Sequence, residues 1–281
     1  MKKRLLTVMA LLGVCALTAC SNTDGAASAA TEGGSQNAES DFDYINKNGK
    51  MVIGITIYEP MNFYEPDNGA LTGFDTEFAS DVCARLGLEK EFQIIDWDMK
   101  ETELKSKNID CIWNGLTVTE ERRANMDFST TYLINKQCVV INSADAGTYT
   151  DKASLSSAML SAESGSAGES AIVDDDTLKT ASYTASNSQQ DALVALNAGN
   201  YDAIVIDYTM AKASVGSGDF ANLQIVDGIE LANEEYAIGF RVGSDMTAKV
   251  NAVISDMIND GSLEKLAIKY DMLDLYEQAV K

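Results

Sequence analysis

Strand-like apolar runs alternate with helical patterns in two separate series along the chain, and this alternation constrains the fold more than any other feature. In the first series, a β-branched run at residues 51–56 precedes apolar residues at helical spacing in residues 74–86. The second series has runs at residues 158–162, 180–184 and 203–206. Strands that alternate with helices predict a largely parallel sheet. The pattern therefore predicts an α/β fold.

Two longer apolar stretches, residues 132–141 and 236–242, follow the first and the second series, respectively. A folded part of about 240 residues is near the size at which one core divides in two. We therefore expect two lobes joined by two extended hinge connections. The expected boundaries are residues 42–134 with 238–281 for one lobe and residues 135–237 for the other.

The first nineteen residues have the three parts of a secretory signal: a basic start, an apolar run and small residues ahead of Cys20. The segment 17–20, Leu-Thr-Ala-Cys, resembles a bacterial lipobox, which predicts that Cys20 carries fatty acyl chains such as palmitate. Residues 20–41 contain no aromatic or branched aliphatic residue, as is typical of a flexible tether. The sequence thus predicts an extracytoplasmic protein anchored to the membrane by lipid; an ordinary signal sequence with an incidental cysteine is the alternative.

The chain is strongly acidic and contains no histidine. It has 21 Lys and Arg against 43 Asp and Glu, which makes the formal net charge −22. Such a surface repels phosphate backbones, so we expect no nucleic-acid partner. Without histidine, Ser-His or Cys-His catalysis and zinc chemistry are disfavoured. We expect a protein that is not an enzyme and needs neither metal nor cofactor.

Three cysteines remain in the expected folded part: Cys83, Cys111 and Cys138. Their number is odd and no CxxC spacing is present. We interpret them as small core residues, with one disulfide left open.

A cation stands at an unusual place after the expected strand at residues 109–113. Thr119 fits a helix N-cap, and a capping box would then want Glu or Gln at position 122. The chain has Arg122 instead, a cation at the positive end of a helix. A bound carboxylate would resolve this conflict, helped by the Thr117 hydroxyl and by close backbone approach at Gly115. The alternative is that Arg122 simply pairs with a surface carboxylate.

Acidic and glycine-rich segments end strands in the second series. Asp207 follows an apolar strand, where it is either a helix N-cap or an acceptor for an ammonium group. Residues 165–169, Gly-Ser-Ala-Gly-Glu, open an expected helix whose backbone N–H groups could face an anion. Tyr58 and Trp97 are candidates for flat apolar walls.

Together these segments resemble the bacterial solute-binding proteins of the polar amino acid class, the receptor subunits of ABC importers. The resemblance covers nearly all of the chain from Gly49 onward and rests on residues 58–63, 73–75, 109–122, 128–132, 165–169 and 202–207. It implies a type II periplasmic-binding-protein-like fold, in which each lobe is a mixed, mostly parallel sheet flanked by helices.

The resemblance also implies roles for nine residues. Arg122 would hold the ligand carboxylate, helped by Thr117 and by backbone amides at Gly115 and Ala167, while Asp207 would take the ammonium. Asn114 and Gly115 stand where relatives present a carbonyl or hydroxyl to the ammonium, and Ser166 precedes Ala167 in the glycine-rich segment. Tyr58 and Trp97 align with positions that line the side-chain pocket.

The resemblance implies a monomer that binds a free L-amino acid and delivers it to the permease of an ABC transporter. No charged group is firmly placed at the side-chain end, which favours a neutral polar ligand such as glutamine or cystine. Two alternatives remain: a ligand-sensing module without transport, and a dehydratase on the same fold. The second would need a proton donor, for which Glu59 and Glu163 are the loose candidates.

Overall fold

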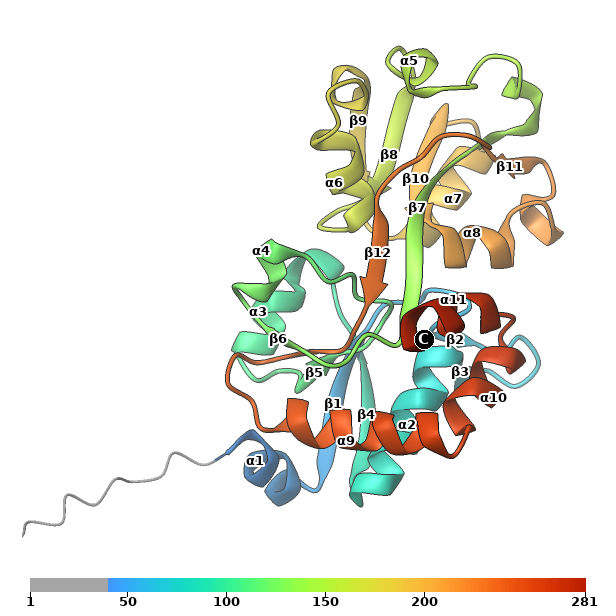
Figure 1. Ribbon diagram of the computed structural model, residues 1–281. Coiled ribbons are helices and arrows are strands. Elements are labelled where there is room, and N and C mark those ends of the chain that lie inside the picture. Colours follow the sequence, from blue (N-terminus) through green and yellow to red (C-terminus); the bar gives the residue numbers. More distant parts are fainter. Residues whose placement is uncertain (1–39) are drawn as a thin grey trace, which may run out of the picture. The chain divides into compact units, whose positions relative to one another are not determined.

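The computed structural model describes residues 40–281. The predicted signal sequence (residues 1–19), Cys20 and nearly all of the predicted tether (residues 20–41) lie outside the described residues. The described part is α/β, with a five-stranded sheet, a six-stranded sheet and a small hairpin of β2 (Phe63–Tyr64) and β3 (Leu71–Thr72). The two large sheets are the centres of two lobes, so the predicted two-lobed α/β fold is confirmed (Figure 1).

The first sheet is built around β1 (Lys50–Ile55). This strand pairs in parallel with β4 (Glu89–Ile94) and β5 (Cys111–Ile112). On the far side of β5, β13 (Gly239–Phe240) runs antiparallel and also pairs with β6 (Asp127–Phe128). The C-terminal part of the chain thus returns to complete the first lobe.

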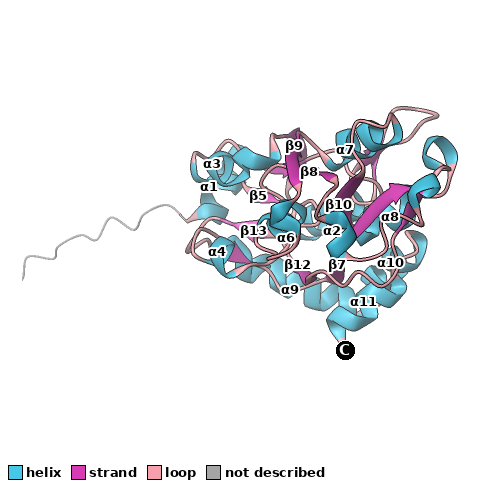
Figure 2. Ribbon diagram, turned by 90° about the horizontal axis from the view of Figure 1, so that it is seen from above, coloured by secondary structure: helices cyan, strands magenta, loops and turns pink. Residues whose placement is uncertain are grey.

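Helices cover both faces of the first sheet. One face packs on α2 (Phe74–Leu86), α9 (Met246–Asn259) and α10 (Ser262–Lys269), whose apolar stripes share one core with β1. The other face packs on the short α3 (Lys100–Lys105) through Leu104. Figure 2 shows the strands enclosed between helices in this way.

The second sheet has the order β11-β7-β10-β8-β9, in which the strands are β7 (Leu133–Asn142), β8 (Met159–Glu163), β9 (Ser182–Ser186), β10 (Ala203–Asp207) and β11 (Leu223–Ile225). Its sixth strand, β12 (Asn233–Tyr236), pairs with β7 outside this order. Parallel pairing holds for β8 with β9 and with β10, whereas β7 runs antiparallel to all three of its partners. The sheets are mixed as predicted, but their antiparallel share is larger than the alternating pattern indicated. The reason is that β7 enters the lobe as a connecting strand and not through a βαβ crossover.

The period of two along β10 decides which helices cover which face of the second sheet. Its residues Ile204 and Ile206 join the core of α7 (Gln189–Asn197) and α8 (Tyr208–Ser214). The alternate residues Ala203 and Val205 join a separate core with α6 (Ala167–Val173) and α5 (Lys152–Leu155).

The chain passes between the two lobes twice, and the two passages lie side by side. In Figure 1 they are the green β7 and the orange β12 (Asn233–Tyr236), which pair antiparallel with Leu133 opposite Tyr236. The C-terminal helix α11 (Leu273–Val280), which the sequence did not predict, packs against β7. These elements hold the two lobes together within residues 40–281.

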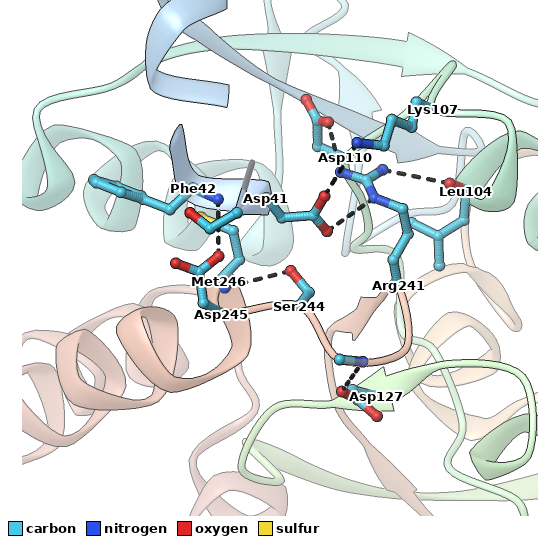
Figure 3. Close-up of polar contacts among 12 residues, drawn as sticks. Asp41, Phe42, Leu104, Lys107, Asp110, Asp127, Arg241, Ser244, Asp245 and Met246 are labelled. Atoms are coloured by element: carbon cyan, nitrogen blue, oxygen red, sulfur yellow. Dashed lines mark hydrogen bonds and ion pairs between the residues drawn. The ribbon is translucent and has the colours of Figure 1, made fainter. Parts of the chain in front are cut away.

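The first helix, α1 (Asp41–Asn48), is fixed to the first lobe by polar contacts (Figure 3). Ser40 caps it, and the Phe42 N–H donates to Asp245 at 2.9 Å. Arg241 lies between two carboxylates, with 2.9 Å from Nε to Asp41 Oδ2 and 3.0 Å from Nη2 to Asp110 Oδ1. The described structure thus begins with a helix that is bonded to residues 241–245, the segment just before α9.

The three cysteines of the described part are buried and carry free thiols, so their interpretation as core residues is confirmed and no disulfide joins them. Burial raises the pKa of the Cys83 thiol to about 12. Across residues 40–281, the helices are all too short or too polar to cross a membrane.

Candidate functional site

All nine residues predicted to bind ligand line one small cavity between the lobes. Its walls also include two residues that the sequence did not single out as binding groups, Glu163 and Gln189. The nine are Tyr58, Trp97, Asn114, Gly115, Thr117, Arg122, Ser166, Ala167 and Asp207. The cavity volume is about 10 Å³, which is room for roughly one water molecule. The lobes are therefore closed on each other in this structure.

Arg122 lies in α4 (Glu120–Arg123), and its side chain turns inward. The predicted N-cap is confirmed, since Thr119 Oγ1 accepts from the Arg122 N–H at 3.1 Å. Arg122 is 8% exposed, and its guanidinium donates to two carbonyls, Thr117 O at 2.7 Å and Gly165 O at 3.0 Å. Within residues 40–281 no carboxylate forms an ion pair with it. The alternative of a surface ion pair is therefore wrong.

The charge of Arg122 is poorly compensated. Burial lowers the pKa of this guanidinium, and the charges of Glu234 and Asp207 act against that shift. A buried cation that is held only by carbonyl oxygens can accept a carboxylate at little further desolvation cost. The site around Arg122 is suited to an anionic group.

Asp207 ends β10 and stands at the N-cap position of α8, but its side chain makes no capping hydrogen bond. Oδ1 accepts from Asn135 Nδ2 at 2.9 Å and from Gln137 Nε2 at 2.6 Å, and Oδ2 accepts from Gln189. The helix-cap alternative for this carboxylate is therefore wrong. Burial raises the pKa of Asp207, which means that a cation beside it would be favoured.

A second buried acid, Glu234 on β12, shares the same amide donors. Glu234 Oε2 accepts from Asn135 Nδ2 at 2.9 Å and from Thr117 Oγ1 at 3.2 Å, and Gln137 Nε2 lies 3.0 Å from Oε1. Burial and the neighbouring Asp207 raise the pKa of Glu234 to about 7. Both passages between the lobes thus carry polar side chains that bond to one another next to Asp207, which lines the cavity.

Two residues expected to face the ligand are engaged within the first lobe. The Gly115 N–H donates to Asp75 Oδ2 at 2.7 Å, so this amide is not free for a ligand carboxylate. The Asn114 side chain bonds Thr56 through its oxygen and Asn62 through its nitrogen, at 2.7 and 2.6 Å. A role of these two residues toward the ligand is confined to their remaining backbone atoms. The helical pattern around Asp75 held no sign that its side chain would reach back to Gly115.

Tyr58 and Trp97 form the aromatic part of the cavity wall. The Tyr58 hydroxyl bonds Thr209 in the second lobe and lies 3.0 Å from the Tyr236 hydroxyl. Trp97 is 5% exposed, and Lys100 Nζ lies 5.0 Å from the centre of its ring. Both rings are fixed by neighbours, which makes them rigid surfaces.

The glycine-rich segment supplies the helix start that the sequence predicted. Ser166 caps α6 by accepting from the Glu169 N–H at 3.1 Å, and Ala167 is the first helical residue. The Gly165 carbonyl accepts from Lys100 Nζ at 2.9 Å as well as from Arg122. Two cations of the first lobe therefore hold one carbonyl of the second.

Lys100 and Glu234 were not predicted as site residues, and Glu163 was not predicted to bind a ligand. Lys100 lies in an exposed-looking helical pattern, and nothing in that pattern shows that it is buried. Two residues that donate to Asp207 could have been predicted from the sequence. Asn135 and Gln137 interrupt the apolar run at residues 132–141 with the spacing of two that places both side chains on one face of a strand. Glu163, like Asp207, ends an apolar strand with an acid, and that rule could have found it.

A larger groove of about 840 Å³ opens next to the cavity and shares Thr117, Arg122 and Ala167 with it. Its walls carry more acids than bases: Asp98, Glu101, Glu121, Glu169, Asp174, Asp175, Glu230 and Glu234 against Lys100, Arg122 and Lys152. Glu59, the other loose candidate for a proton donor, is exposed and lines neither space.

Known proteins match this chain over most of its length. It is 28% identical to the arginine-binding extracellular protein ArtP of Bacillus subtilis, over 96% of this chain and 98% of the relative. It is also 28% identical to the L-cystine-binding protein TcyJ of Escherichia coli, over 80% and 84%. Its structure is similar to an ancestral amino acid-binding protein, a precursor of cyclohexadienyl dehydratase, with a TM-score of 0.75 and 26% identity over 82% of this chain and 99% of that one.

The family model named "Bacterial extracellular solute-binding proteins, family 3" matches residues 50–272, a span that contains both large sheets, both connections and every residue of the cavity. The fold is the type II periplasmic-binding-protein arrangement that the sequence resemblance implied. The chain therefore belongs to the bacterial extracellular solute-binding proteins of family 3.

Proposed function

We propose that this protein binds a free L-amino acid between its lobes. The observation that carries the proposal is Arg122, a buried cation without a carboxylate partner in the described residues, in a cavity that also contains Asp207. The ligand carboxylate takes the guanidinium and the ligand ammonium takes the Asp207 carboxylate. The ArtP and TcyJ relatives, which bind arginine and cystine by name, support an amino acid as the ligand.

Binding requires the lobes to separate and close again, because the cavity has room for little more than a water molecule. The lobes proposed are residues 42–134 with 238–281 and residues 135–237, which move about β7 and β12. A zwitterion contacts Arg122 in one lobe and Asp207 in the other, so it stabilises the closed state over the open one. That difference is the signal that a transporter can recognise.

The proposed destination of the ligand is an ABC importer, in line with the family to which the chain belongs. The protein acts as a monomer held outside the cell by acyl chains on Cys20. Two or more acyl chains give stable membrane anchoring, whereas one does not. Replacing Cys20 by Ser should therefore move the protein from the membrane fraction to the medium, and continued membrane retention would refute the lipid anchor.

Two alternative functions, a dehydratase and a ligand sensor without transport, can be separated from transport by experiment. A dehydratase needs a proton donor in the cleft, and Glu163 is the candidate that lines the cavity. Dehydratase activity should be assayed, because the chain is similar to a precursor of a dehydratase. That precursor is itself described as amino acid-binding. A sensing role without transport differs only in the partner, and co-purification of a permease from membranes separates the two.

The test is a thermal-shift screen of residues 40–281 against the twenty amino acids, cystine and non-amino-acid controls, after refolding to remove carried ligand. A ligand at 100 times its Kd adds about 2.7 kcal/mol, which corresponds to a rise of roughly 5 to 11 °C in Tm for a domain of this size. One or two strong amino acid responses are expected, with a neutral polar amino acid such as glutamine or cystine among them. A flat response would overturn the proposal.

A further inference from the structure

Glu163 is a buried carboxylate with an unused hydrogen-bonding atom. It is the last residue of β8, is 3% exposed, and its Oε1 has no partner among the described residues. A buried polar atom without a partner is destabilising, and more so if the group is charged. Such an atom is retained in a binding cavity when a ligand supplies the partner.

The other two acids near the cavity have a partner on each carboxylate oxygen. Asp207 accepts from three side-chain amides, and Glu234 accepts from Asn135, Gln137 and Thr117. A carboxylate has about four acceptor sites, so Asp207 can still accept from a ligand ammonium. Asp75 also has an unpaired oxygen, but it does not line the cavity. Among the described acids that line the cavity, Glu163 is therefore the one with an oxygen that has no partner.

The charges around Glu163 come from three other elements. Asp207 on β10 disfavours its ionised form, and burial together with Asp207 raises the pKa of Glu163 to about 8. Lys100 on α3 and Arg122 on α4 act in the opposite direction. Lys100 makes no ion pair with Glu163; its ammonium donates to the carbonyls of Trp97 and Gly165 instead, at 3.1 and 2.9 Å. A hydrogen-bond donor on a ligand would therefore not have to displace Lys100 from Glu163.

We propose that Glu163 is a specificity-determining residue that accepts a hydrogen bond from a nitrogen on the ligand's side chain. The inference rests on the proposed function, because Arg122 and Asp207 then occupy the carboxylate and ammonium of the ligand and leave its side chain for Glu163. The ligand class is an amino acid whose side chain carries an amide, a guanidinium or a second ammonium. Acidic side chains carry no N–H donor for Oε1, and alkyl side chains leave it unpaired as well.

The experiment measures the Kd of the refolded protein for L-glutamine, L-arginine and L-cystine, and for the nitrogen-free side chains of L-glutamate and L-norvaline. The wild type should bind at least one of the first three at least 10-fold more tightly than both of the others. In Glu163→Gln, the ratio of the L-glutamate Kd to the Kd of the best nitrogen-bearing ligand should fall at least 10-fold. Glu77→Gln is the matched control, since Glu77 is half-buried and bonds Lys269 and Tyr270 outside the cleft.

The outcomes separate the two proposals. A wild type that binds an amino acid but prefers L-glutamate or L-norvaline overturns the role of Glu163 and leaves the proposed function standing. An unchanged ratio in a folded Glu163→Gln does the same. A wild type that binds none of the five, and none of the other amino acids, overturns the proposed function and this inference with it. The wild-type preference needs no variant, so the inference can be tested even if Glu163→Gln does not fold.

Discussion

Arg122 is buried and Arg241 is half-buried, and the two arginines have different kinds of partners. Arg241 lies between Asp41 and Asp110 and also donates to the Ile109 carbonyl at 2.7 Å (Figure 3). Burial opposes its charge, but hydrogen bonds to the two carboxylates outweigh burial and raise the pKa of Arg241. Within residues 40–281 Arg122 has carbonyl partners alone, and burial lowers its pKa.

The difference separates a structural cation from one suited to a ligand. The carboxylates of the chain complete the environment of Arg241, which connects α1 to the chain just before α9. The environment of Arg122 is left open to an anion from outside. This comparison predicts that removing Arg241 acts on stability and that removing Arg122 acts on binding.

The largest effect is expected from Arg241→Ala. This change leaves the buried Asp110 without its cation and leaves the half-buried Asp41 with Lys107 alone, and breaking a buried pair costs about 3 kcal/mol or more. The free energy of unfolding, measured with urea, should fall by about that amount, while the ligand affinity of the folded fraction stays at the wild-type value. Arg85→Ala is the control, because its pair with Asp260 is largely exposed and should contribute less than about 1 kcal/mol. Equal losses in the two variants would contradict the structural role of Arg241.

The next effect is expected from Arg122→Ala, which should weaken ligand binding by at least about 2 kcal/mol, or about 30-fold. The free energy of unfolding without ligand should change by less than about 1 kcal/mol, because the removed cation had no carboxylate partner. Isothermal titration calorimetry and urea unfolding measure the two quantities. Arg123→Ala is a matched control on the same helix, since Arg123 is exposed and pairs with Glu120. Wild-type affinity in Arg122→Ala would remove this residue from the site.

A similar loss is expected from Asp207→Asn, the corresponding change in the second lobe. The amide is close in shape but carries no charge for the ligand ammonium, so binding should weaken by about 2 kcal/mol. The same calorimetric titration measures it, with Asp202→Asn as a control in the turn before the same strand, where Asp202 accepts from the Met159 N–H. Unchanged affinity in Asp207→Asn would leave Arg122 as the lone charged contact of the ligand.

The smallest effect is a pH dependence of the unliganded protein. Burial raises the pKa of Asp75 to about 7 and that of Glu234 to about 7, whereas both groups titrate near pH 4 when unfolded. Between these values the folded state holds protons that the unfolded state has released, so stability is full below pH 4 for these groups and falls as pH rises to about 7. Each group contributes at most about 1.4 kcal/mol per pH unit.

Urea unfolding at pH 5, 6 and 7 measures this dependence in the wild type and in Glu234→Gln. The variant should lose less stability per pH unit, because one titrating group is gone. Identical slopes in the two proteins would mean that Glu234 is ionised in the folded state throughout this range.

The sequence predicted much of the fold because the first sheet and the outer part of the second are made of local patterns. The run at residues 51–56 became β1, and the helical spacing at residues 74–86 became α2, with matching bounds to within a residue or two. The antiparallel share of each sheet was underestimated, because pairing between β13 and β5 joins segments more than a hundred residues apart. Nothing in local periodicity reports such pairing.

Within the site, the sequence predicted which residues meet but not all of what they do. Most of the nine residues were found because they stand at or after the end of a strand, and in an open α/β sheet these strand ends gather at one edge. The family resemblance supplied the roles of Asn114, Ser166 and Ala167. The engagement of Gly115 by Asp75, and of Asn114 by Thr56 and Asn62, was missed. Those bonds depend on side chains arriving from segments that are about 40 to 58 residues away in the sequence.

The sequence by itself determined the α/β class, the cation at position 122 and the acid at position 207, since strand length, helical period and charge are local properties. The tertiary structure decided which charges are neutralised. In the described part of the chain, Arg241 forms ion pairs with two carboxylates and Arg122 donates to carbonyls. One oxygen of Glu163 has no partner there. The physical reason is that the free energy of a charge depends on its burial and on partners from distant segments of the chain. The residues next to it in the sequence determine neither.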